Sequence, residues 1–232
     1  MNKRIYEVVL CVIILLSIFI LAGCGADNSK ELLKEKIDSE MNYYENVILM
    51  IVKKYMANDY LNDSDSAIDW NLIKNDFNDL NIETNVVITD FSAQNFSNAD
   101  ILKFEERMNQ VNIAISEENE NGMLLALANL YSIIPEYRGR YLGYNSEVTI
   151  RKIRLFNLYS IISCIQGDFL TADEMCVQSE REHINLTNDI EYIKENGYYA
   201  NRIYVVLQEY KNSLKEENLE LSIIKYLNTL GI

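Results

Sequence analysis

Apolar residues recur every three or four positions along most of this chain, and that spacing places them on one face of a helix. The most regular stripe consists of Ile101, Phe104, Met108, Val111 and Ile115. One proline and eight glycines in 232 residues leave few turns for an all-β fold. The sequence therefore predicts an all-α protein.

Apolar stripes, separated by polar residues, define the expected helices. The stripes cover residues 28–60, 66–91, 97–115, 124–134, 146–162, 188–214 and 221–227. Residues suited to helix N-caps are Ser66 with Asp69, Ser97 with Asp100, Asn145 or Ser146, and Asn188 with Glu191. The β-branched residues 86–88 predict an early end to the second helix. Residues 135–143, with Pro135 and two glycines, predict the one long connection.

Helices of this kind, joined by short loops, pack as an up-and-down antiparallel bundle. We expect four to six helices in one domain, residues 30–232. The segment Gly167, Asp168 and Phe169, with Ala172 behind it, resembles the turn of a tetratricopeptide repeat, so a helical-repeat array is the alternative. No second copy stands at the 34-residue period, which favours the bundle. Gly167 either interrupts a helix or closes a sharp turn.

The first 23 residues have the composition of an export signal. Lys3 and Arg4 precede an apolar run, residues 8–22. That run is about 15 residues long, shorter than the ~20 that a helix needs to cross the hydrocarbon core of a bilayer. A signal peptide that is removed is therefore favoured over a permanent transmembrane helix.

Leu21, Ala22, Gly23 and Cys24 close this signal and resemble the lipobox of bacterial lipoproteins. The resemblance implies cleavage before Cys24, a diacylglycerol on its thiol, and a position on the extracytoplasmic face of the cell membrane. Lipidation with several acyl chains gives stable anchoring. Residues 24–29 would then be the lipidated cysteine and a short polar tether. The alternative is an ordinary signal peptide in which the cysteine occurs by chance.

The mature chain is strongly acidic. Removal of residues 1–23 takes away two basic residues and one acidic residue, which changes the formal charge from −14 to −15. Such a surface repels the phosphates of nucleic acids and anionic lipids. We therefore expect no nucleic-acid partner, and membrane attachment that depends on the lipid on Cys24.

Four cysteines occur, and two of them remain as thiols after processing. Cys11 leaves with the signal and Cys24 is acylated, so Cys164 and Cys176 are the only pair. On one helix they would lie about 18 Å apart, whereas the Cα atoms of a disulfide lie about 6 Å apart. We predict two free buried thiols. A disulfide across a hairpin near Gly167 is the alternative.

The C-terminal segment, residues 201–213 and 224–226, resembles the ending of a group of uncharacterised lipoproteins from low-GC Gram-positive bacteria. Trp70, residues 130–137 and residues 167–172 fit the same group, so the similarity spans most of the mature chain. These are packing residues. The resemblance implies a helical domain on the cell surface and no activity.

Glu180 and His183 form the one Glu-x-x-His pair, a spacing that lets two side chains on one helix face bind a metal. A di-metal bundle needs a second such pair, and the chain has no other histidine. We therefore expect a charged, solvated face and no metal, with Glu180 and His183 as weak candidates. Cys176 is seven residues from His183, about 10 Å along a helix, which is too far for proton transfer.

The only cluster of basic and aromatic residues is Tyr137, Arg138, Arg140, Tyr141 and Tyr144. Its arginines and rings suit a carboxylate, a phosphate or a glycan. The favoured interpretation is a loop whose arginines pair with nearby carboxylates while its tyrosines cover helix ends.

Neither a phosphate-binding glycine motif nor a nucleophile elbow occurs. The sequence thus predicts a non-enzymatic helical module that binds a protein or another envelope component, without a cofactor. The alternative is a lipoprotein that binds a small ligand or a metal in a pocket between helices. The oligomeric state is left open.

Overall fold

The structure, a computed structural model, describes residues 3–61, 68–143 and 145–231, with side chains from Ser29 onward. This part of the chain forms eight α-helices and one π-helical turn, and it contains no strand. The elements are α1 (Lys3–Tyr60), α2 (Trp70–Ala93), α3 (Asn98–Ser116), α4 (Glu120–Tyr137), η1 (Arg138–Leu142), α5 (Ser146–Ile165), α6 (Phe169–Thr187), α7 (Ile190–Lys215) and α8 (Leu219–Thr229). The predicted all-α bundle is confirmed.

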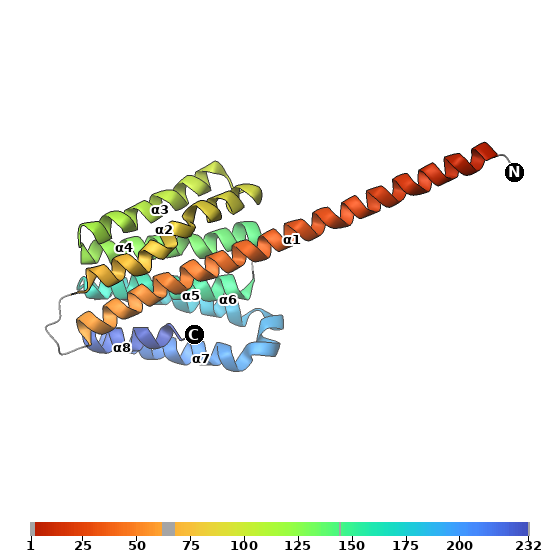
Figure 1. Cartoon of the computed structure of the whole chain (residues 1–232). Helices are drawn as coiled ribbons and strands as arrows, with labels where there is room; N and C mark the ends of the chain where they lie inside the picture. Colours follow the sequence, from red (N-terminus) through yellow and green to blue (C-terminus); the bar gives the residue numbers. More distant parts are fainter. Residues whose placement is uncertain (1–2, 62–67, 144, 232) are drawn as a thin grey trace.

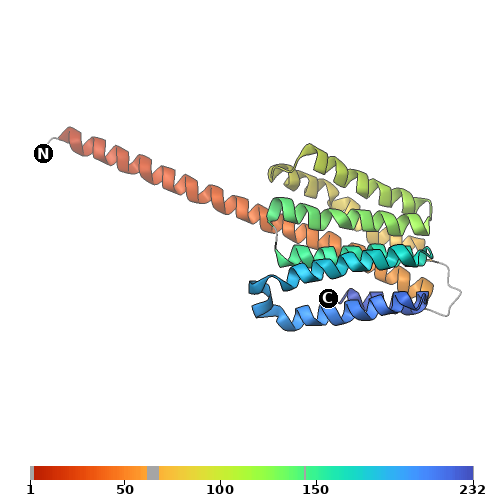
Figure 2. The same ribbon diagram turned by 180° about the vertical axis from the view of Figure 1, so that it is seen from behind.

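The helices after α1 follow one another as antiparallel neighbours, and α1 lies across them (Figure 1). Helix α1 contacts α2, which follows it along the chain, and also the more distant α4 and α8. Buried apolar residues of all eight helices form one large core cluster. The N-terminal part of α1 extends away from the bundle in both views (Figures 1 and 2).

Three tight turns of the same design join α3 to α4, α5 to α6 and α7 to α8. Each turn places one residue in the left-handed region: Glu118 (φ 54°), Gly167 (φ 79°) and Glu217 (φ 50°). The next residue caps the following helix by accepting a hydrogen bond from a backbone N–H: Asn119, Asp168 and Asn218. Each turn reverses the chain, and Gly167 closes the sharp turn before α6. The described residues form eight helices, more than the four to six that we expected.

The predicted connection at residues 135–143 is wrong over most of its length. Pro135 lies inside α4, which passes directly into the π-helical turn η1. The Gly143 N–H donates to the Arg138 carbonyl at 2.9 Å, a bond over five residues, and Gly143 has φ 111°. Pro135 removes one backbone donor inside α4, and the hydrogen bonds resume beyond it, because the Arg138 N–H donates to the carbonyls of Ile134 and Pro135.

Helix α2 does not end at the β-branched residues 86–88 but continues to Ala93. Val87 is buried in the core, and its burial outweighs the low helix propensity of the run. The expected caps Ser97 and Asn145 are confirmed, whereas Asp189, and not Asn188, caps α7. Asp69 caps α2, and Ser66 lies outside the described residues.

Residues 24–29, predicted to be a tether, continue as part of α1. The first buried side chain after them is that of Ile37. A helix from Cys24 to Ile37 rises about 20 Å at 1.5 Å per residue. Among the residues searched, no helix combines the length and the apolar character that a membrane span requires.

Candidate functional site

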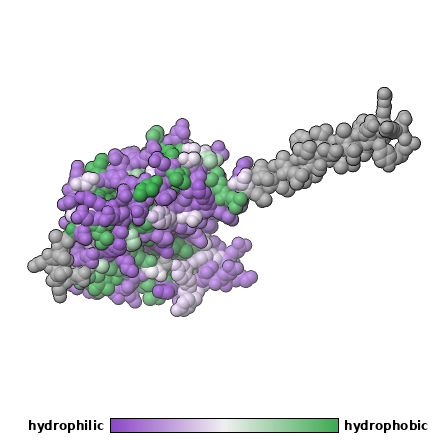
Figure 3. Space-filling model, viewed as in Figure 1, coloured by the Kyte–Doolittle hydropathy of each residue, from purple (hydrophilic) through white to green (hydrophobic). Residues whose placement is uncertain are grey.

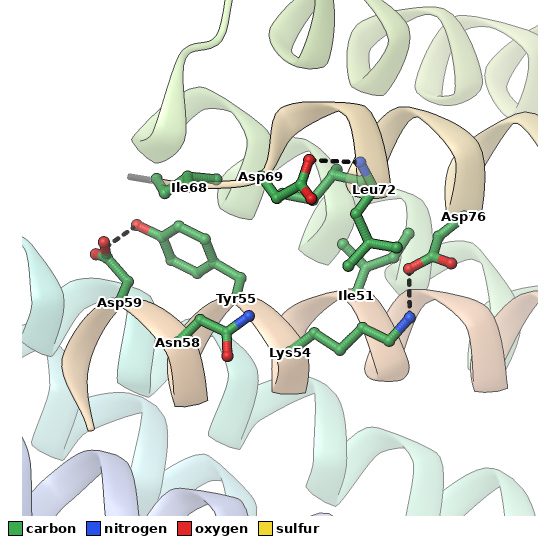
Figure 4. A pocket seen from close by; sticks show the side chains of 10 residues that line it. Ile51, Lys54, Tyr55, Asn58, Asp59, Ile68, Asp69, Leu72 and Asp76 are labelled. Carbon is green, nitrogen blue, oxygen red and sulfur yellow. Dashed lines mark hydrogen bonds and ion pairs between the residues drawn. The ribbon is translucent and has the colours of Figure 1, made fainter. Parts of the chain in front are cut away.

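A cleft of about 350 Å³ opens where the end of α1 meets the start of α2 (Figure 4). We call it the α1–α2 cleft. Its lining residues are Ile51, Lys54, Tyr55, Asn58, Asp59, Ile68, Asp69, Leu72, Ile73 and Asp76. Those before position 60 come from α1, and those from 70 onward come from α2. The two helices run antiparallel, so their facing side chains meet across the cleft.

Apolar side chains form the inner wall of the cleft. Ile51, Tyr55 and Ile73 are buried, because they also belong to the apolar stripes that pack α1 and α2 into the core. Leu72 stands at the edge and is 40% exposed. The cleft therefore offers an apolar surface that solvent reaches from one side.

Carboxylates surround this apolar wall. Asp69 accepts a hydrogen bond from the Leu72 N–H at 3.0 Å and so caps α2. Asp76 forms an ion pair with Lys54 at 2.7 Å. The dashed lines in Figure 4 mark both contacts. Three aspartates, with Asp59, thus face one lysine in the cleft.

The Tyr55 hydroxyl is shared between two carboxylates. It lies 3.3 Å from Oδ2 of Asp59 and 3.3 Å from Oε2 of Glu120, at the start of α4. Burial raises the pKa of Tyr55 well above its ordinary value, so the hydroxyl keeps its single proton. The hydroxyl has one proton, so it can donate to only one of these two carboxylates at a time.

No lysine or arginine among the described side chains forms an ion pair with Asp59, Asp69 or Glu120. Lys54 is therefore the only cation that compensates the charge of the cleft within that part of the chain. The cleft has an excess of negative charge.

The end of α1 and the start of α2, which line the cleft, lie at the end of the bundle opposite the N-terminal extension of α1 (Figures 1 and 2). We call this end the far end. The three tight turns lie at the same end. Exposed acidic residues on or beside these turns are Glu117, Glu118, Glu120, Asp168, Glu216 and Glu217. The negative potential of the far end therefore extends beyond the cleft.

Of the predicted basic and aromatic cluster, Arg138 is buried and paired inside the bundle. Its guanidinium forms ion pairs with Asp38 and Glu147, and it donates to Asn42 Oδ1 at 3.1 Å. Burial lowers the pKa of Arg138. These contacts join η1 to α1 and α5, so Arg138 is a structural residue.

Arg140 and two of the three tyrosines of that cluster, Tyr137 and Tyr141, converge on Asp100, at the start of α3. Arg140 forms an ion pair with Asp100 at 2.6 Å, and the Tyr141 hydroxyl donates to the same carboxylate. Tyr137 is buried and donates to the Asp100 carbonyl. The expectation that the arginines pair with neighbouring carboxylates is confirmed, and Tyr144 lies outside the described residues.

A second charged network, which the sequence did not reveal, centres on Glu45 of α1. This buried carboxylate contacts Arg151 Nε at 2.7 Å, Arg154 at 2.5 Å and the Tyr131 hydroxyl at 2.9 Å. It joins α1 to α4 and α5, and the glutamate is only 3% exposed. A carboxylate inside an apolar stripe was the available signal, but its partners lie about a hundred positions away.

Glu180 and His183 do not form a metal site. Glu180 pairs with Lys211 at 2.5 Å, whereas His183 Nε2 contacts the Ala200 carbonyl at 2.9 Å. His183 is 8% exposed, so the expected solvated face is wrong: the ring packs against α7, near Tyr204. No group of three or more metal-ligating side chains occurs among the residues described.

Cys164 and Cys176 are free and buried, which confirms the preferred prediction. Burial raises the pKa of Cys164 to about 11 and that of Cys176 to about 12, so both thiols stay protonated. A protonated thiol is a poor nucleophile. The predicted lipobox, Leu21 to Cys24, is part of helix α1, and its side chains lie outside the described part of the chain.

Comparisons with protein-family models, with curated proteins and with solved structures each return no match.

Proposed function

We propose that this protein is a lipoprotein, anchored through Cys24 to the outer face of the cell membrane, that binds a protein partner of the envelope without catalysing a reaction. The lipobox, Leu21 to Cys24, supports the anchor. The observation that carries the binding role is the α1–α2 cleft, an acidic cleft with an apolar wall at the far end of the bundle.

The anchoring helix is built into the domain, which supports a fixed presentation of the cleft. Glu45 and Asn42 on α1 are bound to Arg151 and Arg138 inside the bundle. A domain held in this way does not swing freely about its lipid. The far end, with the cleft, then points away from the bilayer, where other envelope proteins can reach it.

The surface of the bundle also favours recognition at a cleft. On the face seen in Figure 3, hydrophilic residues cover most of the surface and the hydrophobic patches are small and separate. A large apolar patch would instead have favoured a broad hydrophobic interface.

Cell fractionation tests the anchor. We expect the wild-type chain in the membrane fraction, with label from radioactive palmitate, and a Cys24→Ala variant without the label. A variant that is still labelled and still cleaved at the same site would contradict the lipoprotein assignment.

Co-purification from detergent-solubilised membranes tests the binding role. Leu72→Asp places a charge on the cleft edge, and Leu102→Asp makes the same change at an exposed leucine near the start of α3. The start of α3 lies at the other end of the bundle (Figure 1). We expect Leu72→Asp to lose a partner that the wild type and Leu102→Asp retain. Equal recovery with all three proteins would contradict binding at the cleft.

A second candidate function, the binding of a small anionic ligand, is favoured by a different cleft. This cleft of about 390 Å³, between α5 and α7, is lined by Arg151, Arg154, Tyr192 and Tyr199 among others. The Tyr192 hydroxyl is buried and has no hydrogen-bond partner among the described residues. A thermal-shift screen of carboxylates and phosphates tests it, because a ligand that binds the folded state raises Tm.

A further inference from the structure

We infer that the α1–α2 cleft takes a lysine or arginine side chain of the partner protein, with its cationic group among the aspartates and its stem against the apolar wall. This inference rests on the proposed binding role and names the chemistry of what is bound. Three aspartates face a single lysine in the cleft, and Glu120 competes with Asp59 for the Tyr55 proton.

Lys54 shows which chemistry the cleft accommodates. Its ammonium group lies 2.7 Å from Asp76 Oδ2, and its side chain lines the cleft beside Leu72 and Ile51 (Figure 4). The Lys54 side chain is 39% exposed, and exposed ion pairs contribute little to stability. A cation of the partner can therefore replace Lys54 at Asp76 with little loss of stability, because the ion pair that it breaks is weak.

The shape and exposure of the cleft favour a side chain of a protein over a free amine. Asn58, Asp59 and Asp69 are exposed, and Leu72 is partly open to solvent. A small amine bound there buries little apolar surface and gains little affinity. A side chain carried by a protein adds the contacts that its backbone makes with the acidic turns nearby.

An anionic side chain would add to the charge of three aspartates that face a single lysine, and a neutral side chain would leave that excess of negative charge in place. A basic side chain satisfies them and covers the apolar wall with its methylene groups. The negative charge and the apolar wall of the cleft thus both favour a lysine or an arginine.

An NMR titration of the full chain in detergent micelles, labelled at isoleucine and leucine methyl groups, tests the inference. The probe is the peptide acetyl-Gly-Leu-Lys-Leu-Gly-amide, and the controls carry Gln or Glu in place of Lys. We expect the lysine peptide to shift the Leu72 and Ile73 methyl signals at concentrations at which the controls do not. Equal binding of the glutamine peptide would overturn the inference.

Two substitutions with opposite expected effects sharpen this test. Lys54→Gln removes the internal competitor and should tighten binding of the lysine peptide by about threefold or more. Asp76→Asn should weaken it by a similar factor, because an ion pair of about 0.7 kcal/mol corresponds to threefold in Kd. Lys74→Gln and Asp79→Asn are the matched controls: each makes the same charge change on α2 outside the cleft, and each should leave Kd within twofold.

Circular dichroism and Tm establish that each variant is folded before its Kd is compared. Failure of Lys54→Gln to tighten binding, in a folded protein, would overturn the inference. Binding of n-butylamine as tight as that of the lysine peptide would also overturn it, because the cleft would then be a site for free amines. A partner that is lost with Leu72→Asp but shows no preference for basic residues would leave the proposed binding role intact and remove this inference alone.

Discussion

The carboxylate of Glu45 on α1 lies 2.7 Å from the Nε atom of Arg151 on α5, and both side chains are buried. The second oxygen of the same carboxylate accepts from Arg154 and Tyr131. One side chain of the helix that carries Cys24 is thus bonded to two other helices. The network makes the part of α1 around Glu45 an integral member of the bundle.

Glu45→Gln should lower the free energy of unfolding by about 3–5 kcal/mol, because it leaves the buried guanidinium of Arg151 without its counter-charge. Urea denaturation measures this change. Glu147→Gln is the matched control: Glu147 pairs with the same arginine at 3.1 Å, but its side chain is 57% exposed. That variant should lose less than about 1 kcal/mol. Equal losses would show that burial does not set the strength of the network.

The carboxyl group of Glu40 should make stability depend on pH near neutrality. Burial, with Asp90 and Glu83 nearby, raises the pKa of Glu40 to about 7, although Lys36 opposes this shift. A raised pKa means that the folded state favours the protonated acid. Its contribution is complete below the unfolded pKa of about 4.5 and is lost as the pH rises through about 7.

Glu40→Gln should therefore be more stable than the wild type at pH 8, by about 1–2 kcal/mol after allowance for partial exposure, and the two should converge at pH 5. Unfolding curves at both pH values measure the difference. Glu31→Gln, at an exposed position of the same helix, should follow the wild type at each pH. A larger advantage of Glu40→Gln at pH 5 than at pH 8 would contradict the raised pKa.

Two glycines should respond to alanine in opposite directions. Gly167 has φ 79°, a conformation that costs an alanine about 1 kcal/mol, so Gly167→Ala should be destabilised. A Cβ on Gly197, one residue after the kink of α7 at Asn196, would meet only Ile193 Cγ2, at 3.9 Å. Gly197→Ala should gain up to about 1 kcal/mol from helix propensity. Thermal unfolding distinguishes the two, and a stabilised Gly167→Ala would show that the turn does not need the left-handed conformation.

The thiols of Cys164 and Cys176 should resist alkylation at pH 8 in the folded protein. Their pKa values, raised by burial to about 11 and about 12, leave almost no thiolate at that pH. Peptide mapping after iodoacetamide treatment should find both modified only when urea unfolds the chain. Rapid modification of either thiol without denaturant would contradict their burial.

Features set by neighbours along the chain could be predicted from the sequence. The stripe from Ile101 to Ile115 and the Ser97 cap are local, and the structure has both. The stripes break where the turns at Glu118 and Glu217 lie, but no stripe marked α6 (Phe169–Thr187), and the number of helices was too low. At Pro135, composition indicated a break where a π-helical turn continues the chain.

The candidate site could not be predicted from local patterns. Ile51 and Tyr55 have the spacing of ordinary core residues, and Asp69 has the position of an ordinary cap. Only the convergence of α1 and α2 brings Asp59, Asp69 and Asp76 around one apolar wall. His183 was likewise predicted to be solvated. Its contact with the Ala200 carbonyl depends on the packing of α7, and nothing within its own helix specifies that packing.

Photo-crosslinking in intact cells tests most directly whether this protein binds an envelope partner at the α1–α2 cleft. A diazirine amino acid replaces Leu72, which is 40% exposed at the cleft, or Leu102, which is 63% exposed near the other end of the bundle. Our account predicts one discrete cross-linked protein from position 72, which Asp76→Asn diminishes, and none from position 102. The same products from both positions, or none from position 72, would contradict it.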